Sequence, residues 1–158
     1  MDILDDEILA LWQSFCRNEV KYIMVGGFAT NFHGFSRITA DLDIWLEDSL
    51  DNRRNFRKSI AQIGVGDFPQ LETMNFVAGF TSIMLNSGLE LDVMTRLSGF
   101  EKEEFQNCYD IANRATINGV EVCFLHLNHL IHEKRTCARP KDLLDLEELE
   151  KIQKGHLG

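Results

Sequence analysis

Positive charge is scarce in this sequence. It has 16 lysine and arginine residues against 25 aspartate and glutamate residues, which gives a formal net charge of −9. A field of this sign repels polyanions, so long nucleic acid is not an expected partner unless a local basic patch overrides the field. A nucleoside triphosphate is not excluded, because a divalent metal ion neutralises much of its charge and carboxylates can then receive it.

Long apolar runs are also missing. No apolar stretch approaches the roughly 20 residues that a membrane-spanning helix needs, and the residues up to Glu7 are acidic where a signal peptide would be basic. None of the four cysteines is separated from another by two residues, which is the spacing of zinc knuckles and redox motifs. We therefore expect a cytoplasmic protein with reduced thiols and no membrane partner.

Chain length and composition fit one domain. The 158 residues, of which 44% are apolar, suffice to close one core without disulfides or a structural metal. No repeat or low-complexity segment divides the chain. We predict a single domain over residues 1–158, in which residues 126–158 form a C-terminal helical extension.

Residue periodicity predicts an alternation of helices and strands. Helical spacing, caps and prolines predict helices over 3–17, 28–35, from a cap at Asp48 or Ser49 to about Ile63, over 126–136, and from Pro140 onward. Short apolar or alternating runs predict strands over 22–25, 41–47, 80–85, 89–95, 114–117 and 120–125. In the third helix we expect Phe56 to face inward and Arg53 outward. The predicted fold class is α/β, or α+β, with a mixed sheet flanked by helices.

Three aspartates, Asp41, Asp43 and Asp92, are candidate ligands of a metal ion. Asp41 and Asp43 alternate with apolar residues, so both lie on one face of a strand, where their repulsion calls for a cation. Asp92 lies between Leu91 and Val93, and a carboxylate in so apolar a strand is costly unless it is paired or metal-bound. Oxygen ligands of this kind suit Mg²⁺. For the Asp-x-Asp pattern alone, a solvated strand edge is the alternative.

Two glycines precede this strand. Gly26 and Gly27 lie between a predicted strand and a predicted helix. Free backbone N–H groups and the helix dipole favour a phosphate at such a place, and glycines allow phosphate oxygens to approach the backbone. The same pair also suits any tight turn.

These features together resemble a known superfamily. Val25-Gly26-Gly27, thirteen further residues and Asp41-Leu42-Asp43-Ile44 are similar to the signature of nucleotidyltransferases of the DNA polymerase β-like superfamily. The chain also resembles the minimal bacterial branch related to type IV toxin–antitoxin nucleotidyltransferases, through His33-Gly34, Arg37, Thr39, Leu91-Asp92-Val93, Leu130-Ile131, Lys134, Arg139-Pro140-Lys141-Asp142 and Asp145. The similarity covers roughly residues 20–150.

The resemblance implies transfer of a nucleoside monophosphate from an NTP, such as ATP, to a hydroxyl on a protein, an RNA end or a small molecule. Asp41 and Asp43 would hold Mg²⁺ or Mn²⁺ against the triphosphate, and Asp92 would bind a second ion or help to deprotonate the acceptor hydroxyl. Gly26 and Gly27 would cradle phosphates. Two cations about 3.5–4 Å apart would stabilise the attacking oxygen and the leaving pyrophosphate.

Basic residues supply further candidates for phosphate binding. Arg37 precedes Asp41 closely and either contacts phosphate, organises the carboxylates or is a surface arginine. Lys134 and Lys141, with Arg139 between them, either face the triphosphate or pair with the acidic helix that follows, for example Lys141 with Asp145.

The sequence departs from the superfamily in two respects. Many members have a serine directly after the glycine, where this chain has Gly27 and then Phe28, and larger members have a separate helical domain that holds the base. We therefore expect a homodimer or a partner protein to complete the nucleotide pocket. A non-catalytic binding or regulatory protein of the same fold is an alternative function, as is a plain mononucleotide-binding module.

Overall fold

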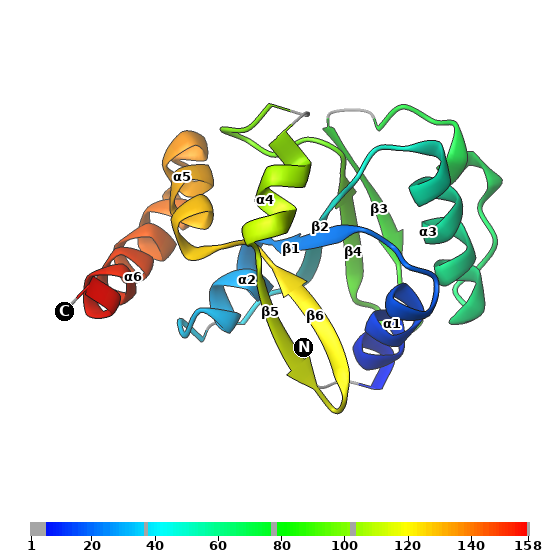
Figure 1. Cartoon of the computed structure of the whole chain (residues 1–158), viewed down its shortest axis with the longest axis horizontal. Coiled ribbons are helices and arrows are strands. Elements are labelled where there is room, and N and C mark those ends of the chain that lie inside the picture. The colour runs from blue at the N-terminus through cyan, green and yellow to red at the C-terminus, as the bar shows by residue number, and fades with distance from the viewer. Residues whose placement is uncertain (1–5, 37, 77–78, 102–103, 158) are drawn as a thin grey trace.

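A mixed sheet forms the centre of the molecule. The computed structural model describes residues 6–36, 38–76, 79–101 and 104–157. Six strands are found in this part of the chain: β1 (Tyr22–Val25), β2 (Asp41–Leu46), β3 (Phe80–Met84), β4 (Glu90–Met94), β5 (Asn113–Ile117) and β6 (Val120–Phe124). They pair in the order β3-β4-β2-β1-β6-β5 (Figure 1). Strands β2 and β4 are parallel, as are β1 and β6, whereas β1 runs antiparallel to β2.

Helices flank this sheet, and the structure confirms the predicted α/β class. They are α1 (Asp6–Arg17), α2 (Gly26–Phe32), α3 (Leu50–Gln62), the short 3-10 helix η1 (Pro69–Glu72), α4 (Phe105–Ile111), α5 (Leu127–Cys137) and α6 (Pro140–Leu157). Helices α5 and α6 lie together at one end of the molecule, far from α1 and α3 (Figure 1). Both predicted hairpins, β3–β4 and β5–β6, are present and antiparallel.

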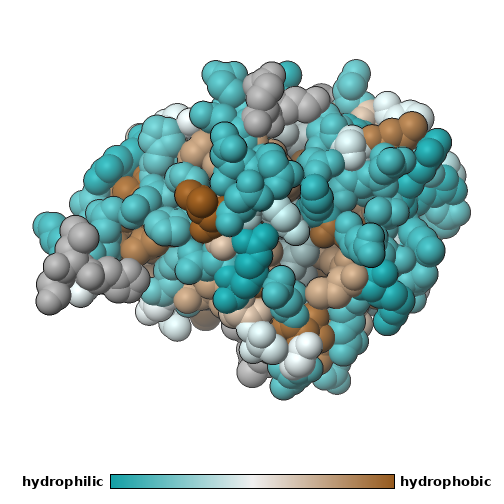
Figure 2. All heavy atoms as spheres, in the orientation of Figure 1, coloured by the Kyte–Doolittle hydropathy of each residue, from teal (hydrophilic) through white to brown (hydrophobic). Residues whose placement is uncertain are grey.

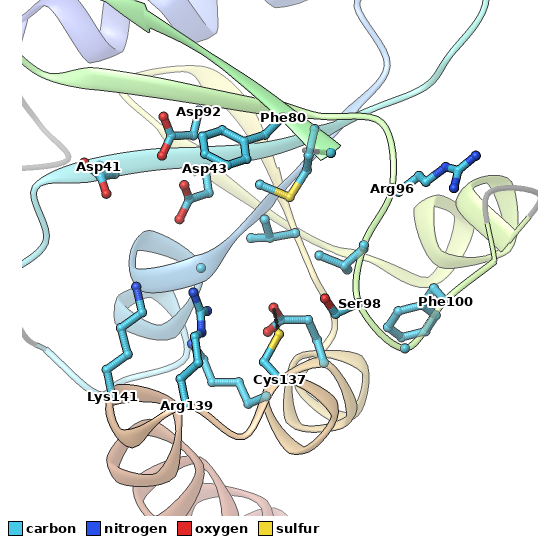
Figure 3. A pocket seen from close by; sticks show the side chains of 18 residues that line it. Asp41, Asp43, Phe80, Asp92, Arg96, Ser98, Phe100, Cys137, Arg139 and Lys141 are labelled. Atoms are coloured by element: carbon cyan, nitrogen blue, oxygen red, sulfur yellow. Dashed lines mark hydrogen bonds between the residues drawn. The ribbon is translucent and has the colours of Figure 1, made fainter. Parts of the chain in front are cut away.

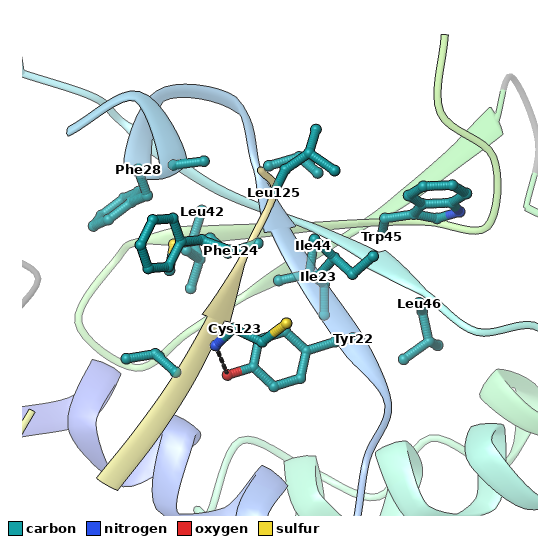
Figure 4. Close-up of a cluster of buried hydrophobic side chains, with 14 of the residues drawn as sticks. Tyr22, Ile23, Phe28, Leu42, Ile44, Trp45, Leu46, Cys123, Phe124 and Leu125 are labelled. Carbon is teal, nitrogen blue, oxygen red and sulfur yellow. Dashed lines mark hydrogen bonds between the residues drawn. The ribbon is translucent and has the colours of Figure 1, made fainter. Parts of the chain in front are cut away.

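One face of the sheet packs on α1 and α3. Tyr22 of β1 pairs with Leu46 of β2, so the two side chains share a face. Trp12 stacks on the ring of Tyr22 at a centroid distance of 5.3 Å, which places α1 on this face. Figure 4 shows Tyr22 and Leu46 on the side of the strands that faces the helices, where the backbone N–H of Cys123 donates to the Tyr22 hydroxyl. This face forms one side of the apolar core.

The opposite face of the same strands is partly polar. Trp45, the next residue in β2 after Ile44, points away from the first core and packs on Phe100 and Phe105. Because side chains alternate along a strand, Asp41 and Asp43 lie on the Trp45 face. The alternation in β2 therefore separates the apolar core from the carboxylates.

The sequence analysis missed one helix and placed one side chain wrongly. Helix α4 was not predicted, although Phe105 and Cys108 are buried at helical spacing. Arg53 was expected to face outward, but it is only 8% exposed. Its guanidinium donates to the Asp48 carboxylate at 2.7 Å and to the Met74 carbonyl at 2.7 Å. These partners satisfy the buried charge, which periodicity alone does not reveal.

The surface in the view of Figure 2 is mostly hydrophilic, with hydrophobic residues in small separate patches. In the part of the chain that the structure describes, no helix combines the length and apolar character needed to cross a membrane.

Candidate active site

Carboxylates meet where β2 and β4 run side by side. The parallel register sets Asp41 opposite Glu90 and Asp43 opposite Asp92. All four residues therefore lie on one face of the sheet, at neighbouring positions. Sequence alternation predicted that Asp41 and Asp43 share a face, and the pairing of β2 with β4 places Asp92 beside them.

Oxygens of Asp41, Glu90 and Asp92 form a tight cluster. One carboxylate oxygen from each lies within 4.8 Å of the others. Ser82 of β3 donates its hydroxyl to Oδ1 of Asp92 at 2.6 Å. The negative charge of Asp92, then burial and the charge of Asp41, raise the pKa of Glu90. Such crowding of negative charge is what a divalent cation relieves.

Asp43 lies beside this cluster in a more enclosed position. Burial, followed by the charges of Asp92 and Asp41, raises the pKa of Asp43 to about 7. The charge of Lys141 acts in the opposite direction and does not offset these effects. Asp43 is therefore the carboxylate whose ionisation depends most on a positive charge being supplied.

The two glycines are the first residues of α2, which begins directly after β1, whereas the sequence had placed them in a turn before the helix. Gly26 adopts a φ of +67°, which favours glycine, and directly follows the last residue of β1. A Cβ at this position would lie 2.1 Å from Oδ2 of Asp43. Gly27 is buried. The start of α2 thus lies directly against Asp43, and phosphate binding by Gly26 and Gly27 stays a prediction.

A cavity of about 820 Å³ opens in front of the carboxylates. Its first wall is the sheet, with Asp41, Asp43 and Asp92. The facing wall comes from the end of α5 and the start of α6, where Arg139 and Lys141 extend toward the aspartates (Figure 3). The volume falls within the roughly 300–1,000 Å³ typical of small-molecule sites.

The predicted basic residues have different surroundings. Lys134 is 3% exposed, and its Nζ lies 3.4 Å from Asp142 and 3.0 Å from Asp145. It joins α5 to α6, which is the pairing with the following acidic helix that we considered for this basic cluster. Lys141 instead lines the cavity, and Arg37 lies outside the described residues. Phosphate binding by all three stays a prediction.

Sequence reasoning passed over Glu90 as a ligand. Glu90 and Asp92 alternate with Leu91 just as Asp41 and Asp43 alternate with Leu42. The carboxylate, apolar, carboxylate pattern that recurs in both strands was the available signal. The parallel register brings the two patterns side by side, with Asp41 opposite Glu90 and Asp43 opposite Asp92.

The donor set fits a hard divalent cation. Asp41, Glu90 and Asp92 offer carboxylate oxygens, the ligands that Mg²⁺ and Mn²⁺ take in proteins, with no histidine or cysteine among them. Asp43 adds a fourth carboxylate at the edge of the cluster. The described residues therefore form a candidate metal site.

Comparison with solved structures identifies the fold. The lincosamide antibiotic adenylyltransferase LnuA, solved with lincomycin bound, superposes with a TM-score of 0.65 at 15% identity, over 96% of this chain and 99% of that one. A protein of Thermotoga maritima classed as a nucleotidyltransferase superposes with a TM-score of 0.54 at 12% identity, over 94% of this chain and 91% of that one. An antigenic nucleotidyltransferase-like protein of Paracoccidioides brasiliensis superposes with a TM-score of 0.51 at 18% identity, over 92% of this chain and 72% of that one. The chain has the nucleotidyltransferase fold.

A scan with protein-family models finds no match, and neither does a search among curated proteins. The likeness thus lies in the fold, and the resemblance to the toxin–antitoxin branch stays a prediction.

Proposed function

We propose that this protein is a metal-dependent nucleotidyltransferase that moves a nucleoside monophosphate from an NTP, ATP being the first candidate, to the hydroxyl of an acceptor. The observation that carries the proposal is the cluster of Asp41, Glu90 and Asp92 on one wall of the cavity. Lys141 on the facing wall supplies the opposite charge, while the guanidinium of Arg139, which also lines the cavity, is paired with Asp142. The fold of the three solved structures supports the same class.

The carboxylates would hold Mg²⁺ or Mn²⁺, with two ions as the expected number. When bound, the ions stabilise negative charge on the attacking oxygen and on the leaving phosphate. Asp41 and Asp43 are the proposed ligands on the triphosphate side, and Asp92 the ligand on the acceptor side. To these we add Glu90, whose carboxylate faces Asp41 across the parallel strands.

The chain's own residues position the reactants and receive a proton. The acceptor oxygen forms a bond to the α-phosphorus, the bond from that phosphorus to the bridging oxygen breaks, and pyrophosphate leaves. Asp92 would accept the proton from the acceptor hydroxyl. Lys141, together with Arg37, Lys134 and the N–H groups of Gly26 and Gly27, would bind phosphate oxygens, and the buried pairs of Lys134 make it the weakest of these candidates.

A small molecule is the acceptor that we favour. The cavity lies between the sheet and the helices α5 and α6, and its volume of about 820 Å³ suits a small molecule. LnuA, which matches this chain over nearly its whole length, is described as an adenylyltransferase of a lincosamide antibiotic. A protein hydroxyl and an RNA end remain alternatives, and a homodimer or partner protein that completes the pocket stays a prediction.

A labelling experiment tests the proposal. The protein is incubated with each α-³²P-labelled NTP and Mg²⁺ or Mn²⁺, together with the small-molecule, RNA or protein fraction of a host lysate. We expect metal-dependent label in the small-molecule fraction. Label confined to the RNA or protein fraction would change the acceptor class, and no labelled product with any NTP would contradict transferase activity.

A further inference from the structure

Glu133 is a buried acid on the helical wall of the cavity. It lies in α5, is 8% exposed and lines the same cavity as the metal-site aspartates. Its Oε2 has no hydrogen-bond partner among the described residues. Its Oε1 accepts from the thiol of Cys137 at 3.5 Å, a weak donor. One carboxylate oxygen is thus left without a donor in the free protein.

The neighbouring cations Lys134 and Arg139 do not supply that donor. Lys134 follows Glu133 in the sequence, but its ammonium lies against Asp142 and Asp145. Burial raises the pKa of Glu133, and the charges of Lys134 and Arg139 only partly oppose this effect. The guanidinium of Arg139 donates to Asp142. A buried carboxylate without a partner costs free energy. Glu133 is therefore not explained by the stability of the fold.

The surroundings of Glu133 differ from those of the phosphate-binding candidates. Ser98, Phe100 and Cys137 lie in the part of the cavity away from the aspartates, whereas Lys141 and Arg139 point toward them (Figure 3). A carboxylate that holds no metal ion would repel a triphosphate. The end near Glu133 consequently suits a group that donates hydrogen bonds and carries positive charge, next to the apolar surface of Leu97 and Phe100.

We propose that Glu133 binds a protonated amine of the acceptor, so that the substrate class is small hydroxylated amines. The carboxylate would accept hydrogen bonds from the ammonium through Oε2, while a hydroxyl of the same molecule lies toward the metal-site aspartates. The identification of this ligand as the acceptor rests on the proposed function. The amine site itself rests on the burial and the unpartnered oxygen of Glu133.

Stability separates a binding role from a structural one. Glu133→Gln keeps the shape of the side chain and removes its charge, and Glu147→Gln, on the exposed surface of α6, is the charge-matched control. We expect the melting temperature of Glu133→Gln to equal or exceed that of the wild type, because an unpaired buried charge is removed. A large drop in Glu133→Gln, absent in the control, would show that Glu133 supports the fold and would overturn the proposal.

Matched ligand pairs test the amine. Glucosamine is compared with glucose, and 3-amino-1,2-propanediol with glycerol, by ligand-observed NMR on the wild type and both variants. We expect the wild type and Glu147→Gln to bind the amines about tenfold more tightly than the neutral partners, and Glu133→Gln to lose this preference. Equal binding of amines and neutral partners by the wild type, binding of neither, or an unchanged preference in Glu133→Gln would overturn the proposal.

The same samples keep this inference apart from the proposed function. ATP with Mg²⁺ is added to each variant, and its effect on the melting temperature is measured. We expect Glu133→Gln to be stabilised by ATP as the wild type is. An amine preference without any effect of ATP would support the amine site and count against nucleotide transfer. Stabilisation by ATP without an amine preference would support nucleotide binding and overturn the amine site.

Discussion

The backbone of Gly26 lies directly against the carboxylate of Asp43: a Cβ on residue 26 would be 2.1 Å from Oδ2 of Asp43. Gly26 also has a φ of +67°, which L side chains rarely adopt. The glycine therefore has two roles, since its positive φ lets the chain pass from β1 directly into α2 and its missing side chain leaves room for the carboxylate.

Gly26→Ala tests this contact, with Gly64→Ala as the control. Gly64 has a similar φ of +82° but nothing within 4 Å of its Cβ position. The control should lose about 1–2 kcal/mol of unfolding free energy from backbone strain, and Gly26→Ala should lose clearly more because Asp43 must also move. Urea unfolding measures both. Equal losses in the two variants would show that Asp43 moves aside freely.

The ionisation of Asp43 predicts a pH dependence of stability without metal. The fold raises its pKa from 3.8 to about 7, so between these values the folded protein holds a proton that the unfolded chain releases. The contribution of this group to stability is therefore present at low pH and is lost as the pH rises toward 7. The melting temperature of Asp43→Asn in EDTA, minus that of the wild type, should increase between about pH 5 and pH 8. A constant difference would refute the raised pKa.

Glu90 should contribute to metal binding as Asp41 does. Glu90→Gln and Asp41→Asn should each weaken Mn²⁺ binding by roughly tenfold or more, because each removes a charged oxygen ligand from the cluster. Asp51→Asn, whose side chain is 94% exposed in the wild type, should bind Mn²⁺ normally. Titration followed by electron paramagnetic resonance measures free Mn²⁺. Normal affinity in Glu90→Gln would remove Glu90 from the site.

Lys134 and Lys141 should respond differently to the same substitution. Lys134→Met removes the ammonium that bridges Asp142 and Asp145, which are 0% and 1% exposed, although Asp142 keeps Arg139. It should cost about 3–5 kcal/mol of unfolding free energy. Lys141→Met should change that free energy by less than about 0.5 kcal/mol and weaken ATP binding. Denaturant unfolding and calorimetric titration check the pair. The reverse pattern would make Lys134 the phosphate ligand.

Much of the fold could be predicted from the residue patterns of its strands. The alternation in residues 41–47 predicted that Asp41 and Asp43 share a face, and β2 shows it. Turn residues predicted both hairpins within a residue or two of their observed ends. These features are local in sequence, so periodicity and turn chemistry determine them.

Long-range pairing accounts for what the sequence did not reveal. Glu90 meets Asp41 only because β2 and β4 are parallel neighbours with a defined register. Lys134, eight and eleven residues before its two partners, pairs with them because α6 folds back on α5. Such choices among several possible partners depend on tertiary packing, which one sequence does not specify locally.

The position of the label after reaction tests nucleotidyl transfer most directly. The protein is incubated with Mn²⁺, an accepted substrate and ATP labelled with ³²P at either the α- or the γ-phosphate, beside Asp92→Asn as the control. We predict that α-label appears in the product, that γ-label appears in pyrophosphate, and that Asp92→Asn forms little of either. Label from the γ-phosphate in the product, or equal turnover by Asp92→Asn, would contradict the account.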